Sequence, residues 1–567
     1  MFLNITSEQS LFKKNVKHLQ SDLFGLLDSL PKALQKTAKK SEEYQFYKLI
    51  FSNIDEDIFS MLYSDVKSRP NSPINAMVSA LILQNRKAWT YEQLFDSIRF
   101  HILVRFALGL DNLDEMPFSP ATLFNFQNRL NDHFAKTGIN LIEQVFDRLT
   151  QKQLKALKLK SNIQRTDSFL AASNIRSYSR LQLLIEMLIR LYRILSDEDK
   201  EKFQQQFKPY VEKTSGQYIY TLKSSDLPHE LEKIGTLYHW ISQNVSPLYQ
   251  EHDIFQIFER VYGEHFTVLN QKVEVKSTDK LTSDTIQSPD DLDATYREKN
   301  GKKSKGQSIN VTETAHPDNP INLVNDIAVN RNNKDDSKIL NERIDKIASQ
   351  TPEIDEMHCD GAFGSSDNDD KFQEHGIKMI QTAIRGPKPV VDLAIEQVSE
   401  TEYIVSCPGQ TVKSQTTRKR HKAVFDLSIC QQCPLHEKCP AFTQKNCRVY
   451  YFAHKDYLRK KRLRAIESIP PERRALRNNV EATVNEFVCK MRKGKLKVRG
   501  VFKTAIFAYT MGISVNFGRI YRLIQNNPKF ANCLGLCLGQ IVKELMAGYS
   551  KIVSSMLFPT YKKLIPA

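Results

Sequence analysis

Three widely separated acidic residues stand where a carboxylate could hold a divalent metal ion. Asp167 follows the alternating stretch "KALKLKSNIQRT", and Asp360 follows "EIDEMHC" and precedes small residues. Glu481 lies in "RRALRNNVEATVNEFVCKM", whose apolar residues recur on one helical face. Mg²⁺ prefers hard oxygen ligands and takes only a few carboxylates beside water and phosphate. Three carboxylates can hold two such ions, so these residues are our candidates for a metal-dependent site.

Each of these residues also has a simpler interpretation. An aspartate at the end of a strand commonly forms a turn or caps a helix. Arg477 lies four residues before Glu481, one turn away on the same helical face. Its cation could contact a scissile phosphate, or the two side chains could form only a surface ion pair. The carboxylates are more indicative together than any of them is alone.

The elements that must position these carboxylates alternate between strands and helices. Alternating apolar and polar residues predict a strand at 155–163, with Asp167 just after it. Further strands are predicted between 286 and 331, in "EIDEMHCDGAF" and in "KMIQTAI", with a capped helix in "KDDSKILNERIDKIAS". Functional groups gather at the carboxyl ends of strands in α/β sheets. Because residues 176–265 read as helical, the pattern predicts an α/β core interrupted by a helical insertion.

The chain before the first strand is expected to be helical. "INAMVSALILQNR" has an apolar face, and Thr90 and Gln93 have the spacing of a capping box. Ser119 precedes Pro120, which suits the first position of a helix. Helices of this kind between 75 and 150 would pack as a small bundle. The bundle could be a helix-turn-helix DNA reader or an ordinary helical domain.

The charge balance indicates a polyanionic partner. The 567 residues contain 81 Lys and Arg against 65 Asp and Glu, a formal charge of +16. Such a surplus favours polyanions through phosphate neutralisation and counterion release. The most apolar stretch, "LQLLIEMLIRLYRIL", carries charges and is shorter than the roughly 20 residues that span a bilayer. The N-terminus lacks the hydrophobic region of a signal peptide, so we expect a cytoplasmic protein with no membrane partner.

The positive charge is highest in three runs, at 413–422, 454–464 and 490–500, with aromatic residues interleaved. Lysine and arginine beside aromatic rings suit a phosphate backbone and unstacked bases. A charge run can also be only a solvated face. Because these runs flank the candidate Glu481, we expect them to contact DNA. The predicted contact residues are Lys419, Arg420, Lys460, Lys461, Arg462, Lys495, Lys497 and Arg499.

The cysteines cluster in one of these basic segments. None of the nine precedes Cys359, and Cys430, Cys433, Cys439 and Cys447 fall close together. In a reducing compartment this clustering favours a metal over disulfides, and the four residues have a plausible spacing for tetrahedral Zn²⁺. Cys407 or His436 could supply the fourth ligand instead. The alternative is a set of reduced thiols in a small β insertion; a zinc ion with four thiolate ligands would be structural.

Several motifs, in order, resemble a known family. They are "RTDSFLAASNI", "HCDGAFGSSDND" and "RNNVEATVNEF", after a stretch that begins "SRPNSPINAMVS" and closes "SPATLFNFQNRL". Over most of residues 65–525 the chain resembles bacterial insertion-sequence transposases of the DDE class. The resemblance implies an RNase H-like core in which Asp167, Asp360 and Glu481 bind two Mg²⁺ or Mn²⁺ ions. It also implies cleavage of double-stranded DNA at transposon ends and joining to target DNA.

The chain departs from that family's pattern around the third carboxylate. Related transposases often have a tyrosine shortly before the arginine and a lysine beyond the glutamate. This chain has Arg474 and Val488 there, and Lys490 could replace the lysine only loosely. Glu486 is therefore a rival to Glu481, although the spacing from Arg477 favours Glu481.

We expect the glycines near Asp360 to admit DNA. Gly361 and Gly364 would let a DNA backbone approach the second carboxylate closely. The acidic residues that follow, from Asp367 to Asp370, are expected to form a solvated loop and the start of a helix. We expect base-sequence reading in the N-terminal helices, around Gln127, Asn128 and Arg129.

The predicted protein is a nucleoid-associated DNA transposase that works as a homodimer in its synaptic complex. The alternatives are a decayed or domesticated DNA-binding protein without catalysis, and a simple metal-dependent nuclease. The predicted fold class is α/β: an RNase H-like mixed sheet with a helical N-terminal domain, a helical insertion and a small Cys-containing basic insertion. The predicted divisions are an N-terminal extension (1–64), the DNA-binding helices (65–150), the core (151–175, 285–400 and 466–525), the helical insertion (176–284), the Cys-rich insertion (401–465) and a helical tail (526–567).

Overall fold

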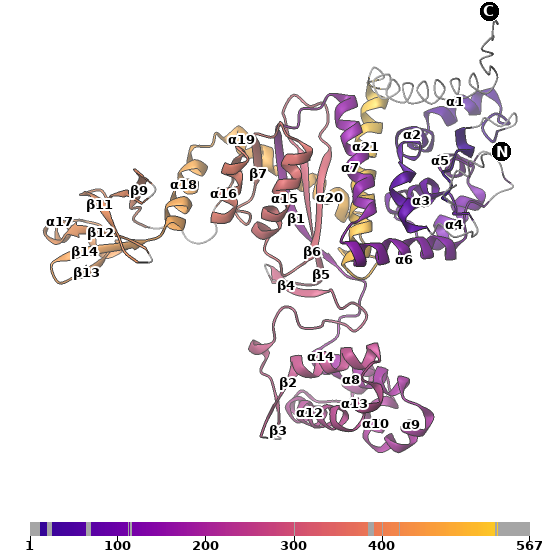
Figure 1. The fold of residues 1–567 in the computed structure, drawn as a ribbon, viewed down its shortest axis with the longest axis horizontal. Coiled ribbons are helices and arrows are strands. Elements are labelled where there is room, and N and C mark those ends of the chain that lie inside the picture. Colours follow the sequence, from indigo (N-terminus) through magenta and orange to yellow (C-terminus); the bar gives the residue numbers. More distant parts are fainter. Residues whose placement is uncertain are drawn as a thin grey trace, which may run out of the picture.

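Figure 1 shows a central sheet flanked by three other groups of elements. N-terminal helices lie on one side of the sheet, a helical lobe lies below it, and a small β lobe lies at the far end. The computed structural model describes residues 12–19, 25–63, 70–110, 113, 116–270, 272–299, 301–383, 390–399, 401–418, 420–527 and 530. Within these ranges, no helix combines the length and apolarity that crossing a bilayer requires.

The central sheet has six strands and mixes parallel with antiparallel pairs. β5 (Lys302–Thr314) pairs antiparallel with β1 (Ile163–Ala172), β4 (Thr295–Lys299) and β6 (Val324–Arg331). On the other side of β1, β7 (Glu356–Cys359) and then β8 (Lys378–Gln381) run parallel to it. The order is therefore β4 and β6 beside β5, followed by β1, β7 and β8.

Helices cover both faces of this sheet. α7 (Leu141–Leu157) and α21 (Val501–Asn526) pack against β6 on one face. A Cβ atom at Gly512 of α21 would lie 2.5 Å from Cδ1 of Ile327, so glycine allows the helix to approach the sheet closely. α15 (Asp336–Gln350) and α16 (Ser366–Glu374) form a second cluster with Met357 and Cys359 of β7. Coverage on both faces explains why all four residues of β7 are buried, including the polar Glu356 and His358.

The N-terminal helices share a core with the sheet. They are α1 (Lys32–Lys40), α2 (Glu42–Leu49), α3 (Ile74–Lys87), α4 (Tyr91–Phe100), α5 (Ile102–Ala107) and α6 (Pro120–Thr137), with short 3₁₀ turns at Lys17–Leu19, Phe51–Asn53 and Glu56–Leu62 (η3). One hydrophobic cluster runs from Phe46 through α3 and α7 to Ile524 of α21. The predicted capping box of Thr90 with Gln93 is confirmed, as is the Ser119 cap before Pro120.

The helical lobe of Figure 1 is inserted between β1 and β4. It contains α8 (Arg180–Ile194), α9 (Asp197–Lys202), α10 (Gln204–Val211), α11 (Ser215–Tyr220), α12 (Leu227–Asn244), α13 (Ser246–Tyr249), α14 (Asp253–His265) and the hairpin of β2 (Phe266–Leu269) with β3 (Lys272–Val275). Its apolar residues form a cluster separate from the main core. The predicted helical insertion is thus present with a core of its own.

The β lobe follows β8 and contains the cysteine segment. Its sheet has the order β13-β14-β12-β11-β10-β9, built from β9 (Ala394–Gln397), β10 (Tyr403–Ser406), β11 (Thr411–Thr416), β12 (His421–Asp426), β13 (Phe442–Gln444) and β14 (Cys447–Phe452). The short helix α17 (Leu427–Gln431) packs on it, and α18 (His454–Ser468) leads back to the core. Arg462 of α18 pairs with Asp369 of α16 and so fastens the lobe to the core.

The first predicted strand is wrong in its position. Leu157 is the last residue of α7, Lys158 turns the chain with a φ of 50°, and β1 begins only at Ile163. The strand then continues to Ala172 because the long β5 pairs with it over residues 164–172. Asp167 therefore lies inside a strand and not after one. Of the predicted C-terminal tail, residues 528–529 and 531–567 lie outside the described residues.

Candidate active site

The sheet register brings the two candidate aspartates to the same level. β1 and β7 pair in parallel, with Arg165 opposite His358. If this register is continued for two residues past Arg165 and past His358, Asp167 lies beside Asp360. Asp360 is the first residue after β7, as the sequence predicted. The pairing of β1 with β7 ends at Arg165, so this side of Asp167 is open to other side chains.

Arg477 joins all three candidate carboxylates. Its Nη2 atom lies 2.9 Å from Oδ2 of Asp167 and 3.9 Å from Oδ2 of Asp360. Its Nη1 atom lies 2.9 Å from Oε1 of Glu481. The arginine side chain is 15% exposed, whereas that of Glu481 is 66% exposed. Three acidic residues from distant parts of the chain therefore gather around one largely buried cation.

Two short helices present Arg477 and Glu481 to the sheet. α19 (Pro471–Asn478) and α20 (Val480–Val488) meet at Asn479. Arg165 of β1 donates a 2.8 Å hydrogen bond to the carbonyl of Leu476 and so ties α19 to the sheet. The buried face of α20, formed by Val480, Thr483 and Phe487, packs toward β1. Glu481 is left on the outer face, one turn beyond Arg477.

The rival carboxylate, Glu486, points the other way. Its oxygens accept hydrogen bonds from Arg519 of α21 at 2.8 and 3.1 Å, and Arg522 lies 3.2 Å away. Arg519 also contacts Glu313 at 2.6 Å, and the Glu313 side chain is fully buried. Glu486 is therefore engaged with α21, and the geometry favours Glu481 as the partner of the two aspartates.

Burial controls the ionisation of the first aspartate. Desolvation raises the pKa of Asp167, while Arg477 and the backbone N–H of Ser168 oppose that rise. The carboxylate of Asp360 raises the same pKa further. A desolvated carboxylate next to another carboxylate is typical of functional sites in which acidic groups share a cation.

The carboxylates have the right donor atoms for a metal but not yet the right spacing. Their oxygens are hard ligands of the kind that Mg²⁺ and Mn²⁺ prefer. Among the described residues, however, no three His, Cys, Asp or Glu side chains lie close enough together to hold one ion. The cation between these carboxylates is instead the guanidinium of Arg477.

The loop after Asp360 packs against β8. A side chain at Gly364 would come within 2.3 Å of Nε2 of Gln381, so glycine is needed there for this packing. The close approach of DNA to Gly361 and Gly364 stays a prediction. The prediction that Asp367 and its neighbours start a helix is confirmed, because they form the first turn of α16. Burial raises the pKa of Asp369 to about 6, and its partner is Arg462.

Of the predicted DNA contacts in the β lobe and α18, some are exposed and others are paired with aspartates. The guanidinium of Arg420 stacks 4.3 Å over the ring of Tyr451 on the exposed part of the second sheet. Lys461 is exposed on α18. The neighbouring Lys460 and Arg462 are paired with Asp392 and Asp369, respectively. Lys419 lies outside the described residues.

The third basic group holds backbone segments together. Lys495 donates to the carbonyl of Ile175 at 2.8 Å, and Lys497 donates to that of Ala88 at 2.7 Å. Arg499 donates to the carbonyl of Asn174 at 2.8 Å and pairs with Asp290. All three are exposed, yet each has a protein partner that a DNA contact would share or replace.

Four cysteines gather at the tip of the β lobe, with one change from the predicted set. Cys407, Cys430, Cys433 and Cys439 line a small cavity together with His436. Cys447 instead begins β14, opposite Asp426 and Gln444. The set of four that includes Cys447 is therefore not supported, and the alternative ligand Cys407 takes its place. The hairpin pairing of β14 with β12 and β13 explains why Cys447 is held apart.

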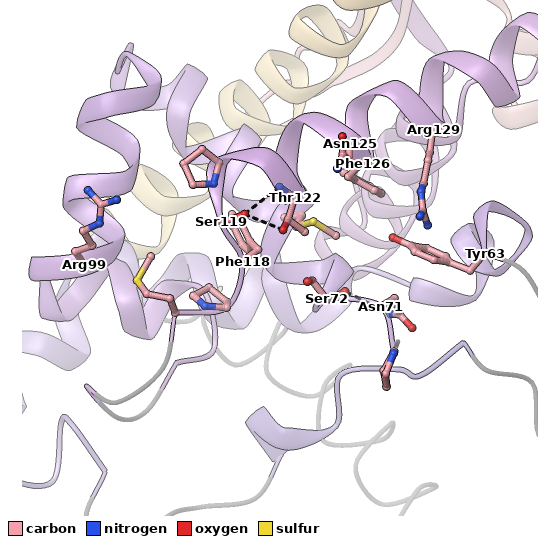
Figure 2. Close-up of a pocket in the computed structure, with 15 residues that line it drawn as sticks. Tyr63, Asn71, Ser72, Arg99, Phe118, Ser119, Thr122, Asn125, Phe126 and Arg129 are labelled. Atoms are coloured by element: carbon pink, nitrogen blue, oxygen red, sulfur yellow. Dashed lines mark hydrogen bonds between the residues drawn. The ribbon is translucent and has the colours of Figure 1, made fainter. Parts of the chain in front are cut away.

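The N-terminal helices form a cleft of about 710 Å³, lined by Tyr63, residues 70–72 and the first part of α6. Figure 2 shows Arg129 beside Tyr63, with 4.8 Å between the guanidinium and the ring. Asn128 and Arg129 are exposed, as a DNA reader must be. Gln127 is buried and exchanges a hydrogen bond with the hydroxyl of Tyr91, so its prediction as a DNA contact is wrong. It lies four residues after Leu123, on the core-facing side of α6.

The sequence reasoning missed the aspartate partners of Arg477. It anticipated Glu481 or a phosphate, because helical spacing relates residues four positions apart. Asp167 is 310 residues earlier in the chain, so no spacing rule applies to the pair. A register between β1 and β7 would have been the only signal, and the mistaken position of the first strand concealed it.

Comparison with known families identifies two regions of the chain. The profile of the Transposase DDE domain matches residues 405–521, and that of the Transposase domain (DUF772) matches residues 35–129. The first match contains Arg477 and Glu481, and the second runs from within α1 through α5 to Arg129 of α6. No curated protein and no solved structure matches the chain. A DDE domain implies an RNase H-like core, which agrees with the mixed sheet described above, and the chain is a transposase of the DDE class.

Proposed function

We propose that this transposase binds transposon terminal repeats and catalyses metal-dependent cleavage and joining of DNA strands. Asp167, Asp360 and Glu481 are the proposed metal-binding carboxylates. The observation that supports this choice is the convergence of all three on Arg477. The rival Glu486 is engaged by Arg519 on another face of α20.

In DNA strand cleavage, the protein is needed mainly to place charge and to position the DNA, and not to form covalent bonds. In phosphodiester cleavage, two bound divalent ions supply an activated nucleophile and stabilise charge on the entering and leaving oxygens. The part of the protein is to hold the carboxylates on a rigid sheet and to bring the DNA backbone to them. Because β1 and β7 are central strands covered on both faces, the two aspartates have firm support. A 3′-hydroxyl in place of water would use the same site for joining.

The test is a cleavage and joining assay on terminal-repeat DNA with Mg²⁺ or Mn²⁺. Asp360→Asn should abolish both reactions while binding of the same DNA persists. Asp367→Asn, on the exposed first turn of α16, is the matched control and should keep full activity. Cleavage without joining by the natural protein would favour a simple nuclease, and binding without either reaction would favour a protein that has lost catalysis.

We propose that the DNA follows the basic surface of the β lobe and α18 toward the carboxylates. Arg420 on Tyr451 offers a cation beside an aromatic ring, which suits phosphates and unstacked bases. Contacts of this kind depend strongly on salt and little on base sequence. Arg420→Ala should therefore weaken binding of all sequences and flatten the salt dependence.

Sequence reading is proposed for the N-terminal helices, for which 65–150 stays our predicted range. The cleft beside Arg129 is the best placed surface there. Arg129→Ala should lower the preference for terminal repeats over random DNA. We further propose a homodimer when two transposon ends are held together, which sedimentation of the DNA complex would test.

A structural zinc ion is proposed for the tip of the β lobe, with Cys407, Cys430, Cys433 and Cys439 as its ligands. The four thiols are the donor types that Zn²⁺ favours, and they line one cavity. In the part of the chain that the structure describes, no three of them lie close enough to hold an ion, so zinc would have to draw them together. Elemental analysis of the purified protein tests the site. Cys407→Ser should lose the zinc and Cys447→Ser should retain it; an absence of zinc from the natural protein would leave a lobe of reduced thiols.

A further inference from the structure

We infer that Arg477 is an internal cation that occupies the carboxylate site when no metal is bound, and that it must leave this position for the site to load. The inference rests on the proposed function, because it takes Asp167, Asp360 and Glu481 to be the metal-binding groups. It adds a competition between a side chain of the protein and the metal for the same oxygen atoms.

The position of the guanidinium supports the competition. Nη2 lies between the two aspartates, 2.9 Å from one carboxylate oxygen and 3.9 Å from the other. A divalent ion held by Asp167 and Asp360 would need those same carboxylate oxygens as ligands. Arg477 and a divalent ion would then be like charges in a partly buried space, where their repulsion is only weakly screened.

Arg477 uses only part of its hydrogen-bonding capacity. Its Nη1 and Nη2 atoms contact carboxylates, but its buried Nε atom has no hydrogen-bond partner within the described part of the chain. Arg519 is the contrasting case, because its Nε, Nη1 and Nη2 atoms all donate to protein oxygens. A buried donor without a partner destabilises the present position of Arg477 relative to one in which Nε is satisfied.

Arg477 lies where its side chain can turn toward solvent. It lies in the last turn of α19, just before the break at Asn479, and its partner Glu481 is largely exposed. A change of rotamer would carry the guanidinium toward solvent without disturbing the packed face of α20. In that outward position it could meet a DNA phosphate, for which a guanidinium is a bidentate partner.

Metal binding without DNA tests the inference directly. Titration calorimetry with Mn²⁺ should give tighter binding to Arg477→Gln than to the natural protein, by about tenfold or more, since the competing cation is gone. Arg477→Lys should fall between the two. Arg473→Gln is the matched control, because Arg473 lies one turn earlier in α19 and pairs with Glu356 instead. Equal or weaker Mn²⁺ binding by Arg477→Gln would overturn the inference.

A measurement on the natural protein covers the case in which the variant folds poorly. Phenylglyoxal modifies accessible arginines, and Arg477 is now 15% exposed. Mass spectrometry should find that Mn²⁺ speeds modification of Arg477 several-fold and leaves that of Arg473 unchanged. An unchanged or slower reaction at Arg477 would contradict its release from the carboxylates.

The double variant Arg477→Gln with Asp360→Asn separates failure of the inference from failure of the proposed function. Loss of Mn²⁺ binding in the double variant would confirm that the tight site uses Asp360. Full retention would show that the metal binds elsewhere, and the proposed function would fail together with the inference. Weak metal binding by Arg477→Gln that still depends on Asp360 would overturn the inference alone.

Discussion

α20 carries two glutamates on different faces, and each is paired with an arginine from a neighbouring helix. On one face, Arg519 binds Glu486 and the buried Glu313, and its guanidinium nitrogens are fully hydrogen-bonded. On the other face, Arg477 binds Glu481 and Asp167, and its Nε atom is unsatisfied. The first cluster is closed over by α21, whereas Glu481 in the second is largely open to solvent.

The two clusters differ as a structural ion pair differs from a functional one. A buried charge that keeps every hydrogen bond supports the fold, because removing one partner leaves another charge stranded. A cation held by carboxylates at a solvent-open edge, with a donor left over, is poised to exchange its partners. The closed cluster is therefore assigned to stability and the open cluster to chemistry.

The largest expected effect is on catalysis and compares the two glutamates. Glu481→Gln should lower cleavage of terminal-repeat DNA by ~10³-fold, because several kcal/mol of transition-state charge stabilisation depend on the bound ions. Glu486→Gln should leave the rate within about tenfold of the natural value, since it lacks contact with the aspartates. Single-turnover cleavage at saturating Mg²⁺ measures both. The reverse order would make Glu486 the third carboxylate.

The next effect is on stability and compares the two arginines. Arg519→Met should destabilise the fold by roughly 3–5 kcal/mol, because the fully buried Glu313 would keep only Arg165 as an ionic partner. Arg477→Met should cost only about 1–2 kcal/mol, since its carboxylate partners can gain water. Urea unfolding monitored by circular dichroism distinguishes them. Equal losses would show that the Arg477 cluster is as structural as the other.

The sequence alone predicted the features that depend on residues close together in the chain. The capping of α4 by Thr90, the Ser119 cap of α6 and the helix at Asp336–Gln350 follow from short-range spacing and were predicted. Asp360 was also placed correctly, because the apolar run before it ends at a loop of small residues. These features depend on hydrogen bonds and periodicities that span a few positions.

Contacts across the sheet could not be predicted in the same way. The strand containing Asp167 was expected too early, because Leu157 and Leu159 alternate like a strand while tertiary packing extends α7 to Leu157. Gln127 was predicted as a DNA contact together with Asn128 and Arg129, but the helical phase of α6 turns it inward. The choice of Cys407 over Cys447 depended likewise on strand pairing within the β lobe.

The smallest expected effect returns to the two glutamates and concerns stability without metal. Glu481→Gln should change the free energy of unfolding by less than about 1 kcal/mol, because a 66% exposed carboxylate gains little from a screened ion pair. Glu486→Gln should cost about 1–3 kcal/mol, since it is less exposed and accepts hydrogen bonds from Arg519. Raising the salt concentration should shrink the first effect and leave most of the second. If Glu481→Gln proved the more destabilising change, its face of α20 would be part of the structural core, and its catalytic loss would then reflect unfolding. Measuring both variants by urea unfolding at low and high salt therefore guards the interpretation of the cleavage assay as well.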